Sequence, residues 1–314
     1  MGIILGAPSL PPAVDHPDWS GMEMTWTGWD GTQWTVSDRS QGVVILAGVR
    51  GLNMPPTRRF VSRTGSLHGS RSRGWTTDER EVFWPVKVFN KEGSTAWLAH
   101  ERAFFNTMHP GKFGTWTVKQ SGGGSSRSLD IKYKDDGGKG FETVPSITGW
   151  QYYDLYLVAE QPFWRGTPVR GIWRVSPPQD FRNDGSHTDR VFYISPGSTM
   201  VNATMDNAGD VETWPVYTVI GPSTSATVGG VTVPFEVPAG KAVRIDTAPG
   251  PLSQTALFGD WVDGAVINTT DRTRELGTID FTPIQPGTGK KLTLSMVGAG
   301  EIRAELTPLY FRAW

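Results

Sequence analysis

Short alternations of apolar and polar residues, broken by turn residues, dominate the chain. The stretch EMTWTGWDGTQWTV has alternating apolar positions on both sides of Asp30-Gly31. Because glycine adopts the positive φ that a tight turn requires, this stretch predicts a hairpin. The run GVVILAGVRG that follows predicts a strand buried on both faces. Further on, GWQYYDLYLVAEQPFWRG at 149–166 predicts a long aromatic strand, central in its sheet or covered on both faces.

One segment, STAWLAHERAFFNTMHPG, has helical instead of strand periodicity. Its large apolar side chains fall near one face: Trp97, Phe104, Phe105 and Met108. Ser94 is expected to cap the start of the helix. Pro110-Gly111 is expected to end it, because proline has no N–H for the helical ladder. The spacing therefore predicts a helix over about 94–109, packed on a sheet.

Strand signals separated by turn residues recur from about 191 to 303, as in VYTVIG, ATVGGVTVPFEVP, KAVRIDTAPG and KLTLSMVG. That spacing predicts an antiparallel sandwich. Ahead of it, GTPVRG, SPPQD and RNDGSHTD have loop character, so we expect the domain boundary there. The pattern predicts a mainly β protein with two β-sandwich domains, 1–175 and 176–303, and a closing strand at 304–314.

The composition agrees with many short strands around packed aromatic residues. The 314 residues include 38 Gly, 23 Pro and 14 Trp. Charged residues make up 19% and the net charge is −1, so no general attraction to nucleic acid or to an anionic membrane is expected. No run approaches the roughly 20 apolar residues that cross a bilayer. The absence of Cys excludes disulfides, thiolate metal sites and cysteine nucleophiles.

The segment 50–80 has a different charge pattern, with seven Arg against two acids and with Ser, Gly and Thr in the gaps. It predicts a long basic loop or a splayed hairpin. Its arginines are either solvated or contact an acidic partner surface. The candidate interface residues are Arg58, Arg59, Arg63, Arg71 and Arg73. No recognisable nucleic-acid-binding fold surrounds them, so sequence-specific binding of nucleic acid is not expected.

Candidate catalytic and metal-binding patterns fail on their spacing. The histidines are not spaced as a zinc pair: His16, His68, His100, His109 and His187. His100-Glu101 begins like HExxH, but Phe104 stands where the second ligand must be. PGTGKK at 286–291 lacks the leading Gly and the Ser or Thr of a phosphate loop, and no GxSxG occurs. We therefore expect no enzyme activity, no cofactor and no metal site.

The acidic stretch DNAGDVETWP allows three interpretations. Asp206, Asp210 and Glu212 do not have the register of a calcium loop. Two carboxylates about 5–10 Å apart can hydrolyse glycosides, so a sandwich glycosidase that depends on Glu212 stays a minor hypothesis. The preferred interpretation is a turn at Asn207–Gly209 that uses left-handed backbone geometry. Asp210 and Glu212 then face solvent, and Trp214-Pro215 starts the next strand.

The order of these segments resembles the distal tail proteins of long-tailed bacteriophages, the minor tail proteins of siphoviruses. An Asn-x-Gly-(Asp)-x-x-x-x-Pro pattern, here within DNAGDVETWP, precedes Ile-Asp-Thr-x-Pro-Gly, here Ile245–Gly250. Upstream, the last strand of the first domain ends in Ala-x-x-Pro-Phe-Trp, here Ala159–Trp164. The chain closes on LYFRAW, which has three aromatic residues and one Arg, where the family commonly has a strand rich in aromatics and Arg. The resemblance covers most of 80–314 and is weakest in the first 50 residues.

This resemblance implies a tail-tube-like sandwich with one helix in the N-terminal domain and a galectin-like sandwich in the C-terminal domain. It implies a structural virion protein, assembled in the host cytoplasm, that forms a hexameric ring at the phage tail tip. The implied partners are further copies of the chain, the tail tube protein, tail hub or baseplate proteins and the tape measure protein, and no membrane. Such a ring needs a head-to-tail interface that closes, and the Arg-rich segment is candidate material for it.

The alternative hypothesis is a carbohydrate-binding tail-tip protein that recognises the host cell surface. It rests on the implied galectin-like domain and on the many tryptophans. Sugar binding needs exposed aromatic side chains. Most tryptophans here fall in strand patterns, and we expect these in the core or in an interface.

Overall fold

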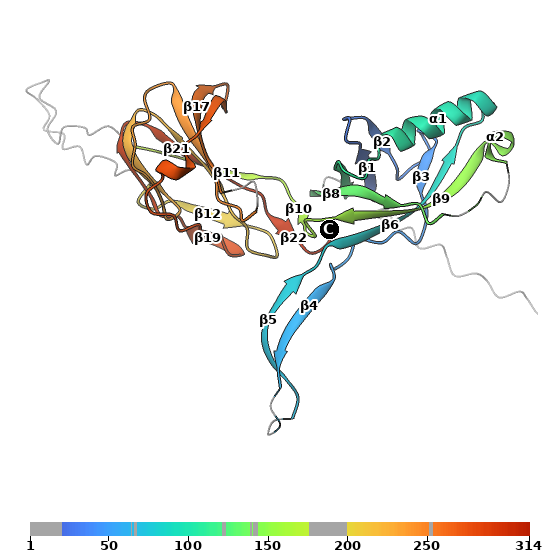
Figure 1. Ribbon diagram of the computed structural model, residues 1–314, viewed down its shortest axis with the longest axis horizontal. Coiled ribbons are helices and arrows are strands. Elements are labelled where there is room, and N and C mark those ends of the chain that lie inside the picture. The colour runs from blue at the N-terminus through green and yellow to red at the C-terminus, as the bar shows by residue number, and fades with distance from the viewer. Residues whose placement is uncertain are drawn as a thin grey trace, which may run out of the picture.

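The computed structural model describes residues 21–63, 65, 68–120, 124–138, 140, 144–175, 200–250 and 254–314. These residues form mainly β-strands in several antiparallel sheets, with few helices (Figure 1). The predicted mainly β class is confirmed. Most of the predicted boundary segment, His187 included, lies outside the described residues, as does His16. The domain bounds at 175 and 303 therefore stay a prediction.

The first part of the chain forms a sheet that almost closes into a barrel. The elements of this part of the chain are β1 (Glu23–Thr27), β2 (Gln33–Thr35), β3 (Val43–Ile45), β4 (Thr57–Ser62), β5 (Arg71–Thr77), β6 (Arg80–Phe89), α1 (Ser94–Asn106), β7 (Gly114–Lys119), β8 (Ser126–Asp135), α2 (Pro145–Thr148), β9 (Trp150–Ala159) and β10 (Trp164–Arg165). The strand order is β2-β1-β7-β8-β9-β6-β3, with β10 and the C-terminal β22 (Leu309–Tyr310) attached. The two ends meet where Ile45 N–H donates to Val36 O, 2.8 Å away.

Four tryptophans fill the inside of this near-barrel sheet: Trp26, Trp84, Trp116 and Trp164. Each is at most 1% exposed. Successive ring centroids along the series are 5.5, 5.1 and 5.0 Å apart, in edge-on or tilted arrangements that suit the ring quadrupoles. The expectation that tryptophans in strand patterns belong to the core is confirmed for these four.

The sequence predicted the position of α1 better than its ends. Gly93, and not Ser94, is the N-cap residue, since Trp97 N–H donates to Gly93 O at 2.9 Å and no side chain caps the helix. The predicted capping by Ser94 is therefore wrong. The helix ends at Asn106, ahead of the predicted 109, where the Thr107 hydroxyl donates to a helix carbonyl. The predicted apolar face is buried or packed on the core: Trp97, Phe104, Phe105 and Met108.

Three strand predictions for this part are confirmed. Gly31 has φ 84° in the turn between β1 and β2, which pair as a hairpin. In β3, consecutive Val43 and Val44 are both buried. Strand β9 lies between β8 and β6, so it is central in its sheet. The outer face of β9 is open to solvent at Tyr152 and Tyr156.

The second part of the chain has two layers. Its elements are β11 (Val169–Arg174), β12 (Thr204–Asn207), β13 (Val216–Ile220), β14 (Ser223–Val228), β15 (Val231–Val233), β16 (Lys241–Asp246), β17 (Ala256–Val262), β18 (Ala265–Asp271), η1 (Thr273–Glu275), β19 (Gly287–Lys291), β20 (Leu294–Gly298) and β21 (Glu301–Leu306). One layer is a six-stranded sheet in the order β11-β21-β13-β16-β17-β18. The other combines the sheets β15-β14-β20 and β12-β19. Alternate side chains of both layers share one core, and the six-stranded sheet leaves its other face open.

Candidate assembly interface

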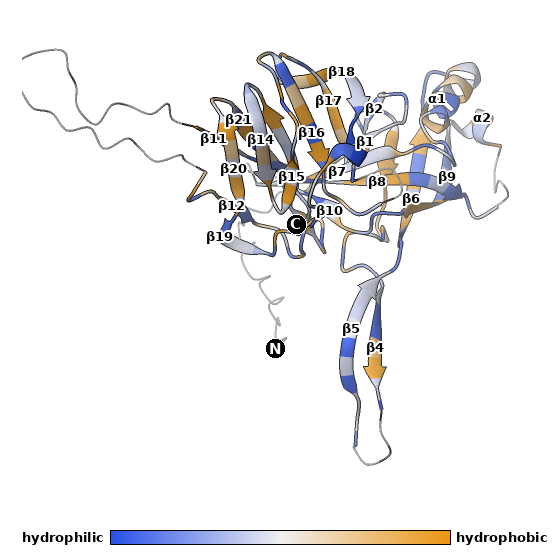
Figure 2. Ribbon diagram, turned by 60° about the vertical axis from the view of Figure 1, so that its left-hand side comes forward, coloured by the Kyte–Doolittle hydropathy of each residue, from blue (hydrophilic) through white to orange (hydrophobic). Residues whose placement is uncertain are grey.

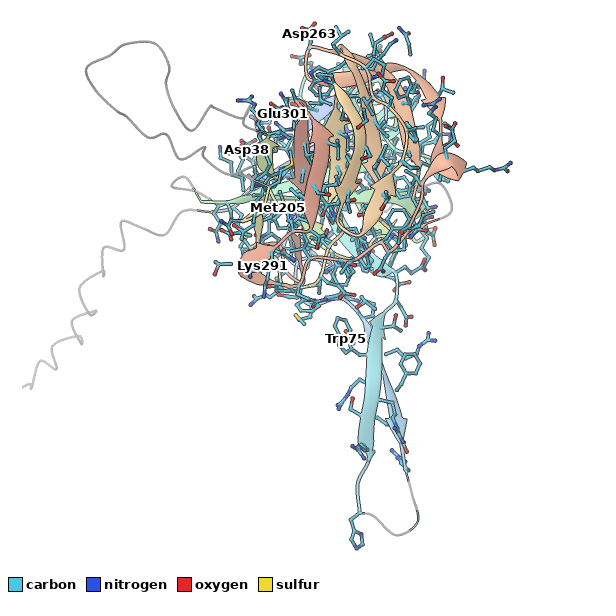
Figure 3. All side chains as sticks on the ribbon, turned by 90° about the vertical axis from the view of Figure 1, so that its left-hand side faces the viewer. Asp38, Trp75, Met205, Asp263, Lys291 and Glu301 are labelled. Carbon is cyan, nitrogen blue, oxygen red and sulfur yellow. The ribbon has the colours of Figure 1, made fainter. Side chains whose placement is uncertain are left out.

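Strands β4 and β5 form a hairpin that projects away from the rest of the molecule (Figures 1 and 3). The pairing runs from Thr57 opposite Thr77 to Ser62 opposite Arg71, with one irregularity after Phe60. This confirms the splayed hairpin predicted from the sequence. The two strands form a sheet of their own, so both outer edges keep unpaired N–H and C=O groups.

The five candidate arginines lie along this hairpin: Arg58 and Arg59 in β4, Arg63 just after it, and Arg71 and Arg73 in β5. Arg58 pairs with Asp78 at 3.1 Å, and both side chains are largely exposed. An exposed pair of this kind contributes only about 0–1 kcal/mol. Among the described residues, the other four arginines have no carboxylate within ion-pair distance. The hairpin therefore presents a surplus of positive charge.

Large apolar side chains accompany these charges on the hairpin. Phe60, Val61 and Trp75 are 49%, 43% and 52% exposed. Figure 2 shows the apolar end of β4 beside the mostly hydrophilic β5. A two-stranded hairpin is at best marginally stable in water. Exposed apolar groups on such an arm are typical of a surface that a partner covers.

The base of the hairpin rests on the end of the chain. The rings of Trp75 and Phe311 have centroids 5.9 Å apart, and Phe311 also contacts Phe163 at 5.8 Å. We call residues 309–314 the C-terminal segment. Through these contacts, its position sets the position of the hairpin base.

Arg80, which follows the hairpin at the start of β6, gathers four backbone carbonyls around one guanidinium. Nε donates to Pro162 O at 2.6 Å, Nη1 to Gly51 O at 2.7 Å and to Asn53 O, and Nη2 to Phe311 O at 2.7 Å. The side chain is 2% exposed. Burial lowers the pKa of Arg80 to about 10, so it stays charged at neutral pH. Nothing in the local sequence distinguishes Arg80 from the other arginines of 50–80, because one of its acceptors lies 231 positions away.

The C-terminal segment is held mainly by the near-barrel sheet. Strand β22 pairs with β10, and the guanidinium of Arg127 lies over the Tyr310 ring, 3.6 Å from its centroid. Arg127 Nη1 donates to Arg312 O at 2.7 Å, and Ala313 N–H donates to Leu52 O at 2.9 Å. The last residues of the chain thus complete the sheet formed by the first part.

The stretch DNAGDVETWP, in the second part of the chain, also holds the C-terminal segment through hydrogen bonds. Asp210 N–H donates to Leu309 O at 2.8 Å, and Asp210 Oδ2 accepts from Phe311 N–H at 2.9 Å. A Cβ on Gly209 would lie 2.6 Å from Leu309 O, so only glycine allows this approach. The buried Asn207 amide donates to two backbone carbonyls and accepts from Gly209 N–H at 2.9 Å.

The predicted turn at this stretch is therefore present, but its predicted backbone geometry is wrong. None of the residues 207–209 has positive φ, because the Asn207 side chain closes the turn by its own hydrogen bond. Asp210 and Glu212 are exposed, as expected. The next strand starts at Val216, just after Pro215. The role of Asp210 as a clamp could not be found from the sequence, because its partners lie about 100 positions away.

The described residues include no group of three or more His, Asp or Glu that could hold a metal ion. Glu212, the residue of the glycosidase hypothesis, accepts a hydrogen bond from Gln285 Nε2. The phosphate-loop-like PGTGKK lies largely in strand β19, which pairs with β12. In the described part of the chain, no helix is long and apolar enough to cross a membrane.

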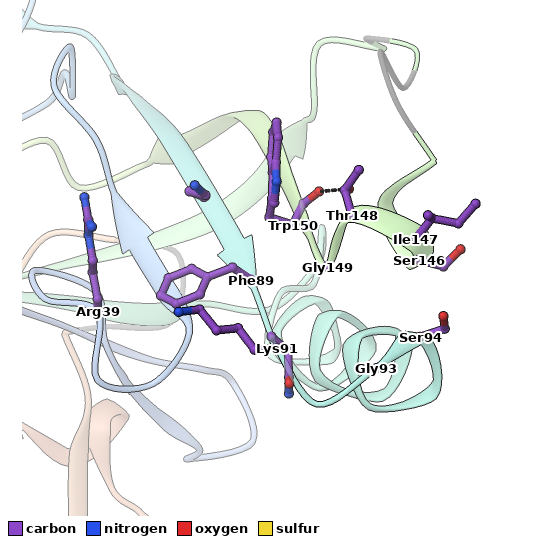
Figure 4. Close-up of a pocket in the computed structure, with 12 residues that line it drawn as sticks. Arg39, Phe89, Lys91, Gly93, Ser94, Ser146, Ile147, Thr148, Gly149 and Trp150 are labelled. Atoms are coloured by element: carbon purple, nitrogen blue, oxygen red, sulfur yellow. Dashed lines mark hydrogen bonds between the residues drawn. The ribbon is translucent and has the colours of Figure 1, made fainter.

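A second basic surface lies at the α1 and α2 end of the near-barrel sheet (Figure 4). It is a groove of about 660 Å³ between the end of β6 and the start of β9. Three cations line it: Arg39, Lys87 and Lys91. Lys87 Nζ lies 5.0 Å from the ring centroid of Trp150, a cation–π distance. This arrangement attracts anionic groups.

Comparison with solved structures places this architecture among the phage tail hub and baseplate proteins by fold. The similarity covers 92% of the chain, so it includes both parts of the molecule. No protein-family model matches the sequence, and no curated protein matches it. Because the sequence identities are low, the similarity is one of fold. It confirms the resemblance to distal tail proteins at the level of the fold.

One similar structure is the crystal structure of the Dit protein of phage SPP1, a paradigm of the hub adsorption apparatus in phages that infect Gram-positive bacteria. The TM-score is 0.52 at 12% identity, with 99% of the SPP1 chain covered. Two others are chains of the phage P2 baseplate in its activated conformation, one with Ca and one with Sr. Their TM-scores are 0.55 and 0.54 at 11% and 10% identity, with 98% of each chain covered.

Proposed function

We propose that this protein is a structural component of a phage tail tip, a distal tail ring that connects the tail tube to the hub or baseplate. The observation that carries the proposal is the similarity in fold to SPP1 Dit over 92% of this chain and 99% of that one. A similarity over the full length is more informative than one confined to a common β domain, because it includes the order and number of the parts. The protein then resides in the virion and assembles in the host cytoplasm.

The proposed ring is a hexamer, with a tail-tube-like domain over 1–175, a galectin-like domain over 176–303 and a closing strand over 304–314. Its proposed partners are further copies of this chain, the tail tube protein, hub or baseplate proteins and the tape measure protein. No enzyme activity and no cofactor are part of the proposal. The role is mechanical, to hold neighbours in a fixed arrangement.

The hairpin is the proposed arm between neighbouring subunits. A closed ring needs two different surfaces on each copy, one that reaches out and one that receives. The hairpin reaches away from the molecule and carries Phe60, Val61 and Trp75 beside its arginines. Apolar side chains supply binding energy when a partner covers them, and the positive charge selects an acidic partner surface.

The C-terminal segment gives this arm a fixed base. Trp75 contacts Phe311, whose carbonyl and N–H are held by Arg80 and Asp210. Because Asp210 belongs to the second part of the chain and Arg80 to the first, both parts hold one anchor. A rigid base lowers the entropy lost when an arm binds its neighbour.

The test is the oligomeric state of the purified protein, measured by light scattering and negative-stain microscopy over a concentration range, with and without tail tube protein. We expect six-fold rings, and a triple variant with Arg58, Arg59 and Arg63 changed to Glu should form fewer rings. The matched control changes three exposed cations elsewhere, Arg102, Arg274 and Lys291, to Glu. A wild-type protein that stays monomeric and does not associate with tail proteins would refute the ring.

A further inference from the structure

The open face of the six-stranded sheet is hollowed along its length. Two adjoining depressions, of about 570 and 270 Å³, share Trp261 and Arg303. The larger lies across β11, β21, β13, β16 and the β17–β18 turn, and the smaller lies at the β13 and β21 end. We call the two together the sheet trough. Its floor is formed by strand residues whose neighbours in sequence belong to the core, so it is built on a rigid element.

A chain of contacts fixes the aromatic side chain of the trough. The guanidinium of Arg303 lies 4.8 Å from the centroid of the Trp261 ring. Arg303 Nε donates to Glu301 Oε1, while Arg174 Nε donates to Glu301 Oε2 at 2.5 Å. Each link limits the rotamers of the next side chain. The indole is therefore held in place before any ligand arrives, and the cost of ordering it on binding is small.

The charges of the trough are paired except for Arg244 and Asp263, which are in no ion pair among the described residues. Arg170 Nε pairs with Glu305 Oε2 at 2.7 Å across β11 and β21. Arg244, in β16, is exposed and lines the larger depression. Among the described residues it has no carboxylate within ion-pair distance. The trough thus offers fixed donor and acceptor pairs, one unpaired cation on β16 and one unpaired carboxylate, Asp263, at the β17–β18 turn.

We propose that the sheet trough binds a saccharide that carries a negative group, either carboxylate or phosphate. A pyranose ring has an apolar C–H face that can pack on the Trp261 indole, and a rim of hydroxyls. Paired Arg and Glu side chains donate to and accept from adjacent hydroxyls, and Arg244 pairs with the anion. The larger depression lies within the roughly 300–1,000 Å³ of small-ligand sites.

A saccharide fits this surface better than a protein partner does. Protein interfaces are centred on desolvated apolar clusters. On this face the strongly exposed apolar side chain is Ile172, and charged residues surround it. The inference depends on the trough alone and does not require the proposed ring, because sugar binding can be measured whether or not rings form.

The experiment is calorimetric titration of the purified full chain with four probes: a uronic-acid oligosaccharide, a phosphate-bearing oligosaccharide, a neutral oligosaccharide of the same length, and inorganic phosphate. We expect at least one charged oligosaccharide to bind about tenfold more tightly than the neutral one and than phosphate alone. The first two probes tell which anion is preferred. No binding of either charged oligosaccharide overturns the proposal.

Variants locate the binding. Trp261→Ala should weaken binding of the charged oligosaccharide about tenfold or more, and Arg244→Ala should remove the preference over the neutral one. The matched controls Trp29→Ala and Arg274→Ala change an exposed Trp and an exposed Arg elsewhere and should bind as wild type. Arg244 is exposed, so its variant keeps the test decisive should Trp261→Ala fold poorly. Binding unaffected by Arg244→Ala, or a trough that binds only another tail protein, refutes the inference.

Discussion

Replacing Arg80 with Met removes every hydrogen bond of a buried guanidinium while keeping an unbranched side chain that extends about as far as Nε. Trp164 Nε1 still donates to Gly51 O at 3.2 Å, so that carbonyl keeps a partner. The carbonyls of Pro162, Asn53 and Phe311 lose the donor that Arg80 supplies. An unsatisfied buried polar group costs about 1–3 kcal/mol.

We therefore expect the free energy of unfolding to fall by about 3–5 kcal/mol in Arg80→Met, after partial relaxation of the three carbonyls. That is a large share of the roughly 5–15 kcal/mol by which a folded domain is stable. Arg80→Lys keeps the charge, but an ammonium group has only three N–H donors for the four carbonyls. The fall in the free energy of unfolding should therefore be intermediate.

The assay is urea unfolding followed by tryptophan fluorescence, since Trp84, Trp116 and Trp164 lie in the core of the sheet in which Arg80 begins β6. The matched control is Arg59→Met, because Arg59 is exposed and has no ion-pair partner among the described residues. It should change the free energy by less than about 0.5 kcal/mol. A loss below about 1 kcal/mol in Arg80→Met would refute the reasoning, because the carbonyls would then be satisfied in another way.

Three further outcomes are expected. Gly209→Ala should loosen the C-terminal segment and raise its rate of carboxypeptidase digestion, since the new Cβ meets Leu309 O. The control is Gly140→Ala, because a Cβ there has open space around it. Equal digestion rates for the two variants would contradict the predicted clash at Gly209. Asp210→Ala should increase the same digestion, because Phe311 N–H loses its acceptor, and no increase would show that the clamp is dispensable. Burial raises the pKa of Tyr217, and burial together with the nearby Glu101 raises the pKa of Tyr153. These two of the seven tyrosines should therefore ionise in the native protein only above the ordinary pKa of about 10. Since unfolded tyrosines ionise near that value, the free energy of unfolding should fall as pH rises above about 10; full tyrosinate absorbance without unfolding would contradict this.

Local sequence patterns predicted the elements that depend on neighbouring residues. The Asp30-Gly31 hairpin, the central strand β9 and the apolar face of α1 each follow from spacing within one segment. The capping of α1 was mispredicted, because Gly93 and Ser94 are both acceptable cap residues and the local sequence does not choose between them.

The anchor of the hairpin could not be predicted, because it joins distant parts of the chain. Arg80 differs from Arg58 or Arg73 only in what the fold brings around it, including a carbonyl 231 positions later. In the same way, the local sequence of DNAGDVETWP predicts a turn with solvent-facing acids, but it does not indicate that Asp210 accepts a hydrogen bond from Phe311 N–H. The trough around Trp261 combines side chains of several strands, and no single segment indicates it.

The pairing of β22 with β10 has a consequence for the order of events during synthesis. A ribosome makes residues 309–314 after the whole of the second part, so the first sheet stays unfinished while more than a hundred residues are added. Until then Arg80 lacks one acceptor and the edge of β10 is open to wrong pairing. A chain that stops short of Leu309 therefore lacks Phe311, so Arg80 loses one of its acceptors and Trp75 loses the ring that it contacts at the base of the hairpin.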